Sequence, residues 1–254
     1  MRKRITDKKN WAIICGITII VLVLFYPIVF EGKTFGSPDS LNPRSSSMIL
    51  EQSRKTDGQF PLWQPWIFSG MPTADAFTYI SSLYFPNYVL NLLFQSSHLN
   101  QLLHLIFSGL GGFVFLRFLG LSKIVAFMGG TAFMITPFMI TMIVFGHGSQ
   151  MMTAAYLPWI MWMTIKVMTK PSFCVVGLLA VLMGFQLQRA HAQIAYYTWM
   201  LAGAYVLFYL LWNIKNTKET KIKWLGLGGF LVASLLGIGI ALLIYLPSIE
   251  YTPF

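Results

Sequence analysis

Charged side chains are scarce in this sequence. Asp, Glu, Lys and Arg together make up 10% of the 254 residues, whereas 56% of the residues are hydrophobic. Soluble domains ordinarily contain about 25% charged residues, because their surfaces face water. The composition therefore excludes an ordinary soluble domain and predicts a protein whose main solvent is a lipid bilayer.

Cysteine is scarce too, and its two positions do not suggest chemistry. Cys15 and Cys174 each lie in the middle of an apolar stretch, where packing as a small hydrophobic side chain is the usual role. His98 and His104, six residues apart, do not share a helix face well, so we expect no structural metal site. The sequence also lacks a Walker loop, a dinucleotide fingerprint and a nucleophile elbow, so nothing in it supports cytosolic nucleotide chemistry.

Basic residues outnumber acidic ones, 18 against 8, giving a net charge of +10. Binding to nucleic acid would require these residues to gather on a folded surface, interleaved with aromatic side chains. They instead form short clusters between apolar runs, as the positive-inside rule expects of a membrane protein. We therefore expect contact with a lipid bilayer and none with nucleic acid.

Seven apolar runs are candidates for crossing a membrane. A crossing needs roughly 20 mostly apolar residues, and these must be helical because the bilayer offers no partners to backbone polar groups. The first run could be a signal peptide, but it is long and no small-x-small cleavage site follows, which favours an uncleaved anchor. We predict an all-α fold, a polytopic helical bundle of about seven spans forming one membrane domain over residues 1–254. The runs are 11–30, 99–116, 124–145, 151–165, 173–188, 194–212 and 224–246.

The placement of charge predicts a cytoplasmic N-terminus. With that orientation, thirteen of the eighteen Lys and Arg residues fall in cytoplasmic segments, and six of the eight carboxylates fall outside. An odd number of spans before Lys215 would place that lysine outside and break this alternation, so the number of spans and the orientation support each other. The thirteen are Arg2, Lys3, Arg4, Lys8, Lys9, Arg117, Lys123, Lys166, Lys170, Lys215, Lys218, Lys221 and Lys223.

One long external segment, residues 31–98, follows the first span. It is too small for a two-layer domain of its own, so it must lean on the membrane or on the bundle. Its second half, residues 76–95, is rich in Tyr, Phe and Leu but interrupted by Ser, Pro and Asn. We expect one or two interfacial helices with aromatic anchors there, and an extra pair of half-spans is the alternative.

Two carboxylates on the external side are candidates for chemistry. Asp39 follows the first span closely, and the flanking Gly36 and Pro38 should fix a turn around it. A solvated loop aspartate would have the same appearance in sequence. Glu250 follows the last span on the same side and is either a pocket residue or a charge at the end of a helix.

Trp63 and Trp66 lie in an external stretch, residues 61–72, that also holds three prolines and a glycine. This density of proline excludes a helix. Tryptophan can stack on the face of a sugar, and it also anchors proteins at the lipid interface. Both roles stay open for this stretch.

Two external turns between spans resemble each other. Gly-His-Gly-Ser-Gln occupies 146–150 and Arg-Ala-His-Ala-Gln occupies 189–193, so each turn offers a histidine and a glutamine. The planar guanidinium of Arg189 can bind two phosphate oxygens at once. Alternatively, its side chain extends to the lipid interface and binds no ligand. The matching placement hints at one shared pocket with the side chains of His147, Gln150, Arg189, His191 and Gln193.

Five segments, taken in order, resemble the YfhO-like family of bacterial membrane proteins. They are the Asp39 turn, the Pro-Leu-Trp to Ser-Gly-Met-Pro stretch at 61–72, the Gly-His-Gly-Ser-Gln turn, Ala-His-Ala-Gln-Ile-Ala-Tyr-Tyr at 190–197 and Leu-Pro-Ser-Ile-Glu-Tyr at 246–251. The resemblance spans nearly the whole chain. The sequence departs from the family pattern at Gly148 and Ala190, where Asn is common. Family members are longer, so the resemblance implies that this chain is an N-terminal portion.

The family is similar to GT-C-type membrane glycosyltransferases, which take a sugar from a polyprenyl-phosphate carrier on the external face of the membrane. The resemblance therefore implies an enzyme of the bacterial cytoplasmic membrane that modifies an envelope glycan or polymer. It implies that Asp39 is the general base and that Arg189, His191 and His147 stabilise the leaving phosphate. No cofactor is certain, and a divalent cation held with Asp39 stays open. The further residues expected to bind substrate are Gln150, Gln193, Trp63, Trp66 and Glu250.

The rival interpretation is a non-enzymatic protein, either a transporter of lipid-linked saccharides or a membrane assembly protein. Transporters usually place polar residues and broken helices near the membrane midplane. The spans here contain Gly129, Gly130 and Pro137 but no charge in their middle. The transferase is therefore favoured, mainly by the resemblance.

Overall fold

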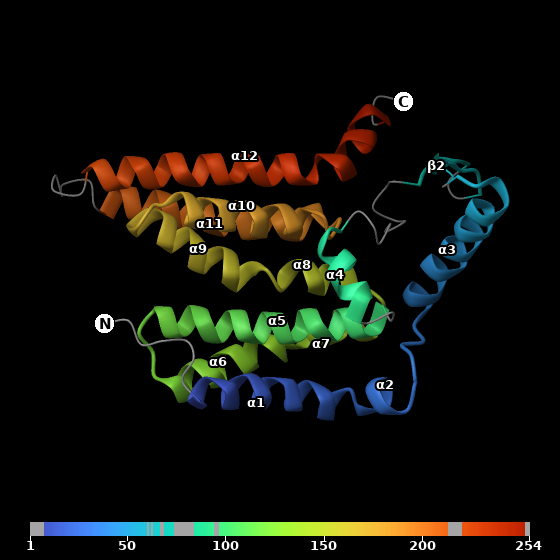
Figure 1. Ribbon diagram of the computed structural model, residues 1–254, viewed down its shortest axis with the longest axis horizontal. Coiled ribbons are helices and arrows are strands. Elements are labelled where there is room, and N and C mark those ends of the chain that lie inside the picture. The colour runs from blue at the N-terminus through green and yellow to red at the C-terminus, as the bar shows by residue number, and fades with distance from the viewer. Residues whose placement is uncertain are drawn as a thin grey trace.

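Long helices lying side by side make up most of the molecule (Figure 1). The computed structural model describes residues 8–59, 61, 63–66, 69–73, 84–93, 97–212 and 220–251. The predicted all-α fold is confirmed there, apart from one hairpin of two-residue strands. The uninterrupted long helices of the bundle are α5 (Ser97–Phe118), α10 (Phe173–Leu187), α11 (Ala192–Trp212) and α12 (Thr220–Tyr251).

Four helical segments of the described chain are long and apolar enough to cross a membrane. They are His98–Phe118, Lys123–Val144, Ala192–Trp212 and Lys221–Leu246, and two shorter apolar helices cover Trp11–Leu24 and Phe173–Leu187. Their outward faces carry many exposed large apolar side chains, among them Leu207, Leu235 and Leu243. Such faces would be unstable in water but match lipid tails. The chain is therefore a membrane protein.

All seven predicted apolar runs are helical, but three of them consist of two pieces. The pieces are α1 (Lys8–Leu24) and α2 (Tyr26–Phe30), α6 (Lys123–Met134) and α7 (Pro137–Val144), and α8 (Gly148–Ala154) and α9 (Leu157–Thr169). Each second piece has a proline, Pro27, Pro137 or Pro158, in its first two positions. Proline lacks an amide N–H and fits the start of a helix better than its interior. Broken helices are thus a consequence of proline placement.

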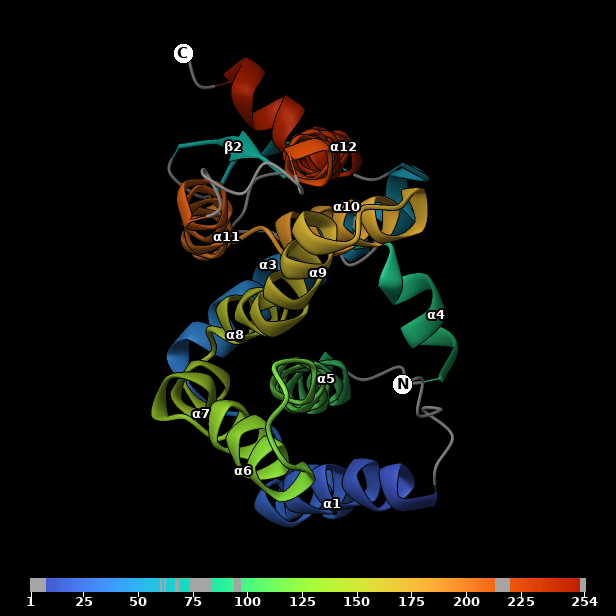
Figure 2. The same ribbon diagram turned by 90° about the vertical axis from the view of Figure 1, so that its left-hand side faces the viewer.

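Glycines allow the helices to approach closely. Helix α5 packs along α6, and α10 packs along α12. A Cβ atom added at Gly130 would lie 2.5 Å from the carbonyl oxygen of Gly109, and one at Gly237 would lie 2.9 Å from Cβ of Met183. Small residues at helix interfaces are typical of membrane bundles, where packing replaces the hydrophobic effect. In the view turned by 90°, α5 lies between α1 and α9 (Figure 2).

The described part of the segment predicted to be external, called the external segment below, gathers at one end of the bundle (Figure 1). It comprises α3 (Pro38–Asp57), strands β1 (Trp63–Gln64) and β2 (Met71–Pro72), and α4 (Pro86–Leu93). The strands are antiparallel, with Trp63 opposite Pro72, so the prediction that this stretch is not helical holds for the part described. Helix α4 is one helix within the segment predicted to hold interfacial helices, whose residues 76–83 and 94–95 lie outside the described part.

The last helix is longer than the predicted span. Helix α12 continues to Tyr251 and includes Pro247 and Glu250, which the sequence analysis placed beyond the span. It bends near its C-terminal end (Figure 1), as a proline inside a helix leads one to expect. Glu250 therefore lies in the last turn of a helix rather than in a loop.

Candidate functional site

Asp39 and His147 form a pair at the end of the bundle that carries the external segment. Oδ2 of Asp39 lies 3.3 Å from Nε2 of His147. Asp39 belongs to the first turn of α3, and His147 immediately precedes α8. The side chain of Asp39 is 59% exposed and that of His147 is 42% exposed, so both can reach a ligand. Two of the predicted site residues are thus in direct contact.

The backbone around Asp39 differs from the prediction. The sequence analysis expected a turn at residues 36–40, but a helix begins at Pro38, with Ser37 in extended conformation at the N-cap. Proline is favoured at the first helical position, and an acidic residue in the first turn interacts favourably with the helix dipole. Ser-Pro-Asp was therefore a readable signal for the start of a helix. The consequence is that Asp39 is held by a rigid element.

A sharp turn before α8 positions His147. Gly146 has φ 92°, a left-handed conformation that glycine adopts without strain. The carbonyl oxygen of His147 accepts a hydrogen bond from the amide of Gln150 at 2.9 Å, within the first turn of α8. A Cβ atom at Gly148 would lie 2.4 Å from Nε2 of Gln101. Any larger side chain at position 148 would therefore require Gln101 to move.

His191 lies in the second external turn, between α10 and α11, and is half-buried. Burial lowers the pKa of His191 below its ordinary value, and the positive charges of His147 and Arg189 lower this pKa further. Charge effects of this kind fade over a Debye length at exposed sites. The two turns predicted to share a pocket therefore lie close enough to influence one another electrostatically.

Arg189 does not occupy the exposed position that the sequence analysis assumed. Its side chain is 1% exposed, and its Cζ atom lies 4.3 Å from the centroid of the Tyr84 ring. The guanidinium is therefore inside the protein and lies over an aromatic face. This arrangement favours a fixed, buried positive charge that acts on His191 over direct bidentate binding of a phosphate by Arg189.

Tyr84 itself belongs to a buried polar cluster. Its hydroxyl lies 2.7 Å from Nε2 of His104 and also bonds to the hydroxyl of Tyr156. Nδ1 of His104 lies 2.8 Å from the carbonyl oxygen of Asn100. From the sequence, His104 was a candidate only for metal binding, and neither tyrosine was predicted to have a role. The available signal was a histidine inside an apolar helix, since polar side chains there must find partners.

Two buried glutamines fix the end of α10, and the sequence analysis missed both. Gln188 accepts a hydrogen bond from the amide of Phe85 at 3.1 Å and donates one to the carbonyl oxygen of Ile240 at 3.0 Å. Gln186 donates to the carbonyl oxygen of Thr153 and accepts from the indole of Trp199. The turn that carries His191 is therefore anchored to α12, to α8 and to the residues just before α4.

The other predicted site residues lie elsewhere at this end of the molecule. Gln193 donates to the hydroxyl of Tyr197 at 2.8 Å on the exposed face of α11. Trp63 and Trp66 are about half exposed in the hairpin, whose strand β2 contacts α12. Gln150 is half-buried beside His147. The side chain of Glu250 lies outside the described part of the structure.

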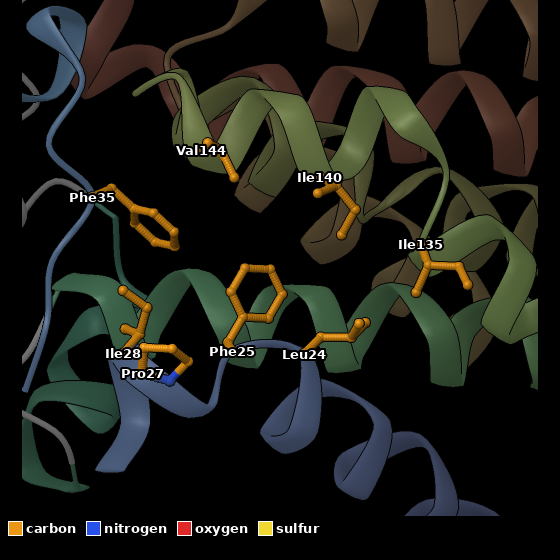
Figure 3. A pocket seen from close by; sticks show the side chains of 8 residues that line it. All are labelled: Leu24, Phe25, Pro27, Ile28, Phe35, Ile135, Ile140 and Val144. Atoms are coloured by element: carbon orange, nitrogen blue, oxygen red, sulfur yellow. The ribbon is translucent and has the colours of Figure 1, made fainter. Parts of the chain in front are cut away.

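An apolar cavity of about 500 Å³ includes Phe35 and Val144 in its lining, which lie four residues before Asp39 and three before His147 in the sequence. It lies between α1 and α2 on one side and α6 and α7 on the other, where both are interrupted by proline, and Figure 3 shows side chains from both sides pointing into it. Val144 precedes His147 by three residues, which span at most about 11 Å. The lining residues are Leu24, Phe25, Pro27, Ile28, Phe35, Ile135, Ile140 and Val144.

Within the described residues, no group of three or more His, Cys, Asp or Glu side chains is placed to hold a metal ion. The sequence left a divalent cation with Asp39 open, and it stays open. No known family model matches the chain, and neither does any curated protein or solved structure. The site therefore has to be interpreted from its own chemistry: an accessible carboxylate–imidazole pair, a second imidazole, a buried cation and an apolar cavity.

Proposed function

We propose that this chain is a membrane glycosyltransferase of the GT-C type, which uses a polyprenyl-phosphate-linked sugar to modify an envelope glycan or polymer. The observation that carries the proposal is the contact between Asp39 and His147, near enough to His191 for the charge of His147 to act on it. A carboxylate that is oriented yet accessible can act as a general base. Cationic and N–H groups beside it suit a phosphate leaving group.

The proposed orientation places this site on the external face of the bacterial cytoplasmic membrane, with about seven spans and a cytoplasmic N-terminus. The opposite end of the bundle carries the ends of α5, α6, α9 and α12 that hold the clustered basic residues (Figure 1). Positive residues are retained on the cytoplasmic side during insertion. These described residues are Arg117, Lys123, Lys166, Lys170, Lys221 and Lys223.

The proposed reaction is a displacement at the anomeric carbon. An acceptor hydroxyl oxygen attacks this carbon and forms the new glycosidic bond, while the bond from the carbon to the phosphate oxygen breaks and polyprenyl phosphate leaves with the electron pair. Asp39 takes the proton of the acceptor hydroxyl. His147, 3.3 Å away, holds the carboxylate in place. A positioned base contributes roughly 10²- to 10⁴-fold to such a rate.

The leaving phosphate gains negative charge during this step. The imidazoles of His147 and His191 can donate hydrogen bonds to it, and the buried charge of Arg189 attracts it from below. A polyprenyl donor also needs an apolar surface for the isoprene units next to its phosphate. The cavity bordered by Val144 and Phe35 offers that surface, and its volume falls within the range of about 300–1,000 Å³ typical of ligand pockets.

The test is a transfer assay with the purified full chain in proteoliposomes, supplied with a panel of radiolabelled polyprenyl-phosphate hexoses and a crude envelope-glycan acceptor. Transfer of label to the acceptor without an ion gradient is the expected result. Failure of every donor to transfer, with correctly inserted protein, would overturn the proposal.

One observation favours a lipid-linked saccharide transporter as the second candidate. Helices α1 and α2 and helices α6 and α7 are interrupted side by side around the cavity, and broken helices mark the binding sites of many transporters. The same proteoliposomes separate the two functions. Movement of a fluorescent lipid-linked sugar between leaflets, without transfer to the acceptor, would support the transporter.

A further inference from the structure

Arg189 is the most deeply buried charged side chain at this end of the bundle, and its guanidinium faces the ring of Tyr84. We propose that Tyr84, His104 and Tyr156 form a buried platform that positions Arg189 beneath the phosphate-binding turn. These three are positioning residues, since their effect on the site runs through Arg189. The proposal deepens the proposed function and relies on it only for the identity of the ligand.

The hydrogen bonds of the platform fix the orientation of the Tyr84 ring. Nδ1 of His104 lies 2.8 Å from a carbonyl oxygen and must carry the proton that it donates, so Nε2 accepts from the hydroxyl of Tyr84. The oxygen of Tyr84 then accepts from the hydroxyl of Tyr156. Every hydroxyl hydrogen has a defined partner, and a fully satisfied buried network of this kind is rigid.

The platform joins separate parts of the chain. His104 belongs to α5, Tyr156 directly precedes α9, and Tyr84 lies two residues before the start of α4. The Tyr84 ring also meets Phe185 of α10 edge to face, with centroids 6.3 Å apart. Tyr84, 1% exposed, is therefore held from several sides.

A buried guanidinium is stable only when its environment compensates for the loss of water. The negatively polarised face of an aromatic ring provides part of this compensation. Removal of the ring would let Arg189 rotate toward solvent, away from its present position. Because the charge of Arg189 contributes to the lowered pKa of His191, the titration of His191 reports where that charge is.

The experiment uses the full chain in lipid nanodiscs with ¹³C-labelled histidine, and the His191 signal is assigned with His191→Gln. Tyr84→Leu should raise the pKa of His191 toward its ordinary value, while Tyr84→Phe, which keeps the ring, should raise this pKa less. The matched control is Tyr88→Leu, because Tyr88 is 63% exposed on α4 and should have no effect. The groups that act on His191 are His147, whose partner is Asp39, and Arg189.

A change in burial alone could also move this pKa, so the variants are repeated in an Arg189→Gln background. The effect of Tyr84→Leu should disappear there if it runs through Arg189. An unchanged His191 titration in folded Tyr84→Leu, or an equal shift in both backgrounds, would overturn the platform. If Tyr84→Leu does not fold, Tyr84→Phe provides the test. Without its hydroxyl the ring is no longer held in one orientation, so the pKa of His191 must also rise in part.

Binding of a short-chain polyprenyl-phosphate hexose keeps the two proposals apart. The wild-type protein should bind it, and Tyr84→Leu should bind it roughly tenfold more weakly, as the loss of one cation–π contact allows. A wild-type protein without affinity for this probe would count against the proposed function. The titration of His191 would still test whether the platform positions Arg189, because this measurement needs no ligand.

Discussion

The carboxylate of Asp39 lies 3.3 Å from the imidazole of His147, although the first belongs to α3 and the second to the turn before α8. The contact joins the external segment to the helical bundle. It also orients a carboxylate that remains more than half exposed, which is the arrangement that a general base requires. The pair is therefore the first target for mutation.

Asp39→Asn should reduce sugar transfer by roughly 10²- to 10⁴-fold, because the amide has the shape of the carboxylate but cannot take a proton. Initial rates in proteoliposomes measure the effect. Asp57→Asn is the matched control, since Asp57 lies in the last turn of the same helix and accepts a bond from Ser53 on its exposed side. Equal rates for Asp39→Asn and wild type would remove Asp39 from the mechanism.

Ligand binding should raise the pKa of His191. Burial and neighbouring positive charge lower this pKa in the free protein. A bound phosphodiester stays negative between about pH 5 and 8 and favours the imidazolium, so binding takes up protons and affinity increases as the pH falls through the raised pKa. Calorimetry in buffers of different ionisation enthalpy measures the uptake. His191→Gln should abolish this component of the pH dependence; its persistence would assign the proton to another group.

Filling the apolar cavity should weaken binding of the lipid tail. Val144→Trp places an indole among the lining residues and should cost roughly tenfold or more in affinity for a long-chain polyprenyl-phosphate hexose, since each displaced CH₂ is worth about 0.8 kcal/mol. The same change at Val232, on the exposed side of α12, is the control. If both variants bind like the wild type, the tail lies outside this cavity.

Gly130→Ala should destabilise the bundle. The added Cβ would lie 2.5 Å from a backbone oxygen of Gly109 and 2.7 Å from the amide nitrogen of Phe113, neither of which can move aside cheaply. Overpacking of this kind costs roughly 1–3 kcal/mol. Gly177→Ala, with nothing within 4 Å of the new atom, should not destabilise. Thermal unfolding in one detergent compares them, and equal melting temperatures would contradict the close approach of α5 and α6.

Ala190→Gly should stabilise the turn before α11. Ala190 has φ 58°, a left-handed conformation that costs an L-residue roughly 1–2 kcal/mol and glycine almost nothing. The greater freedom of glycine in the unfolded chain offsets part of this gain, so the net effect should be about 1 kcal/mol or less. Ala192→Gly, at the first position of α11, should instead lower the melting temperature. A lower melting temperature for Ala190→Gly would contradict the backbone conformation.

Apolar runs of about 20 residues predicted the helices correctly, because lipid leaves a spanning chain no other way to pair its backbone groups. The interruptions at Pro27 and Pro137 were readable as well, since proline restricts the backbone locally. Helix α3 was missed although Ser37-Pro38-Asp39 is a local start signal, because its composition is polar and no apolar periodicity marks it. The prediction of about seven spans with a cytoplasmic N-terminus goes beyond the four segments that length and apolarity support here.

The sequence by itself determined that the chain is a helical membrane protein and that the polar residues Asp39, His147 and His191 lie outside its apolar runs. Composition and residue spacing suffice for this, since partition into lipid depends on local chemistry. Only the tertiary structure decided that Asp39 meets His147, that Arg189 is buried against Tyr84, and that an apolar cavity opens between α2 and α7. Contacts between distant segments depend on how the helices pack, and local sequence does not specify that packing.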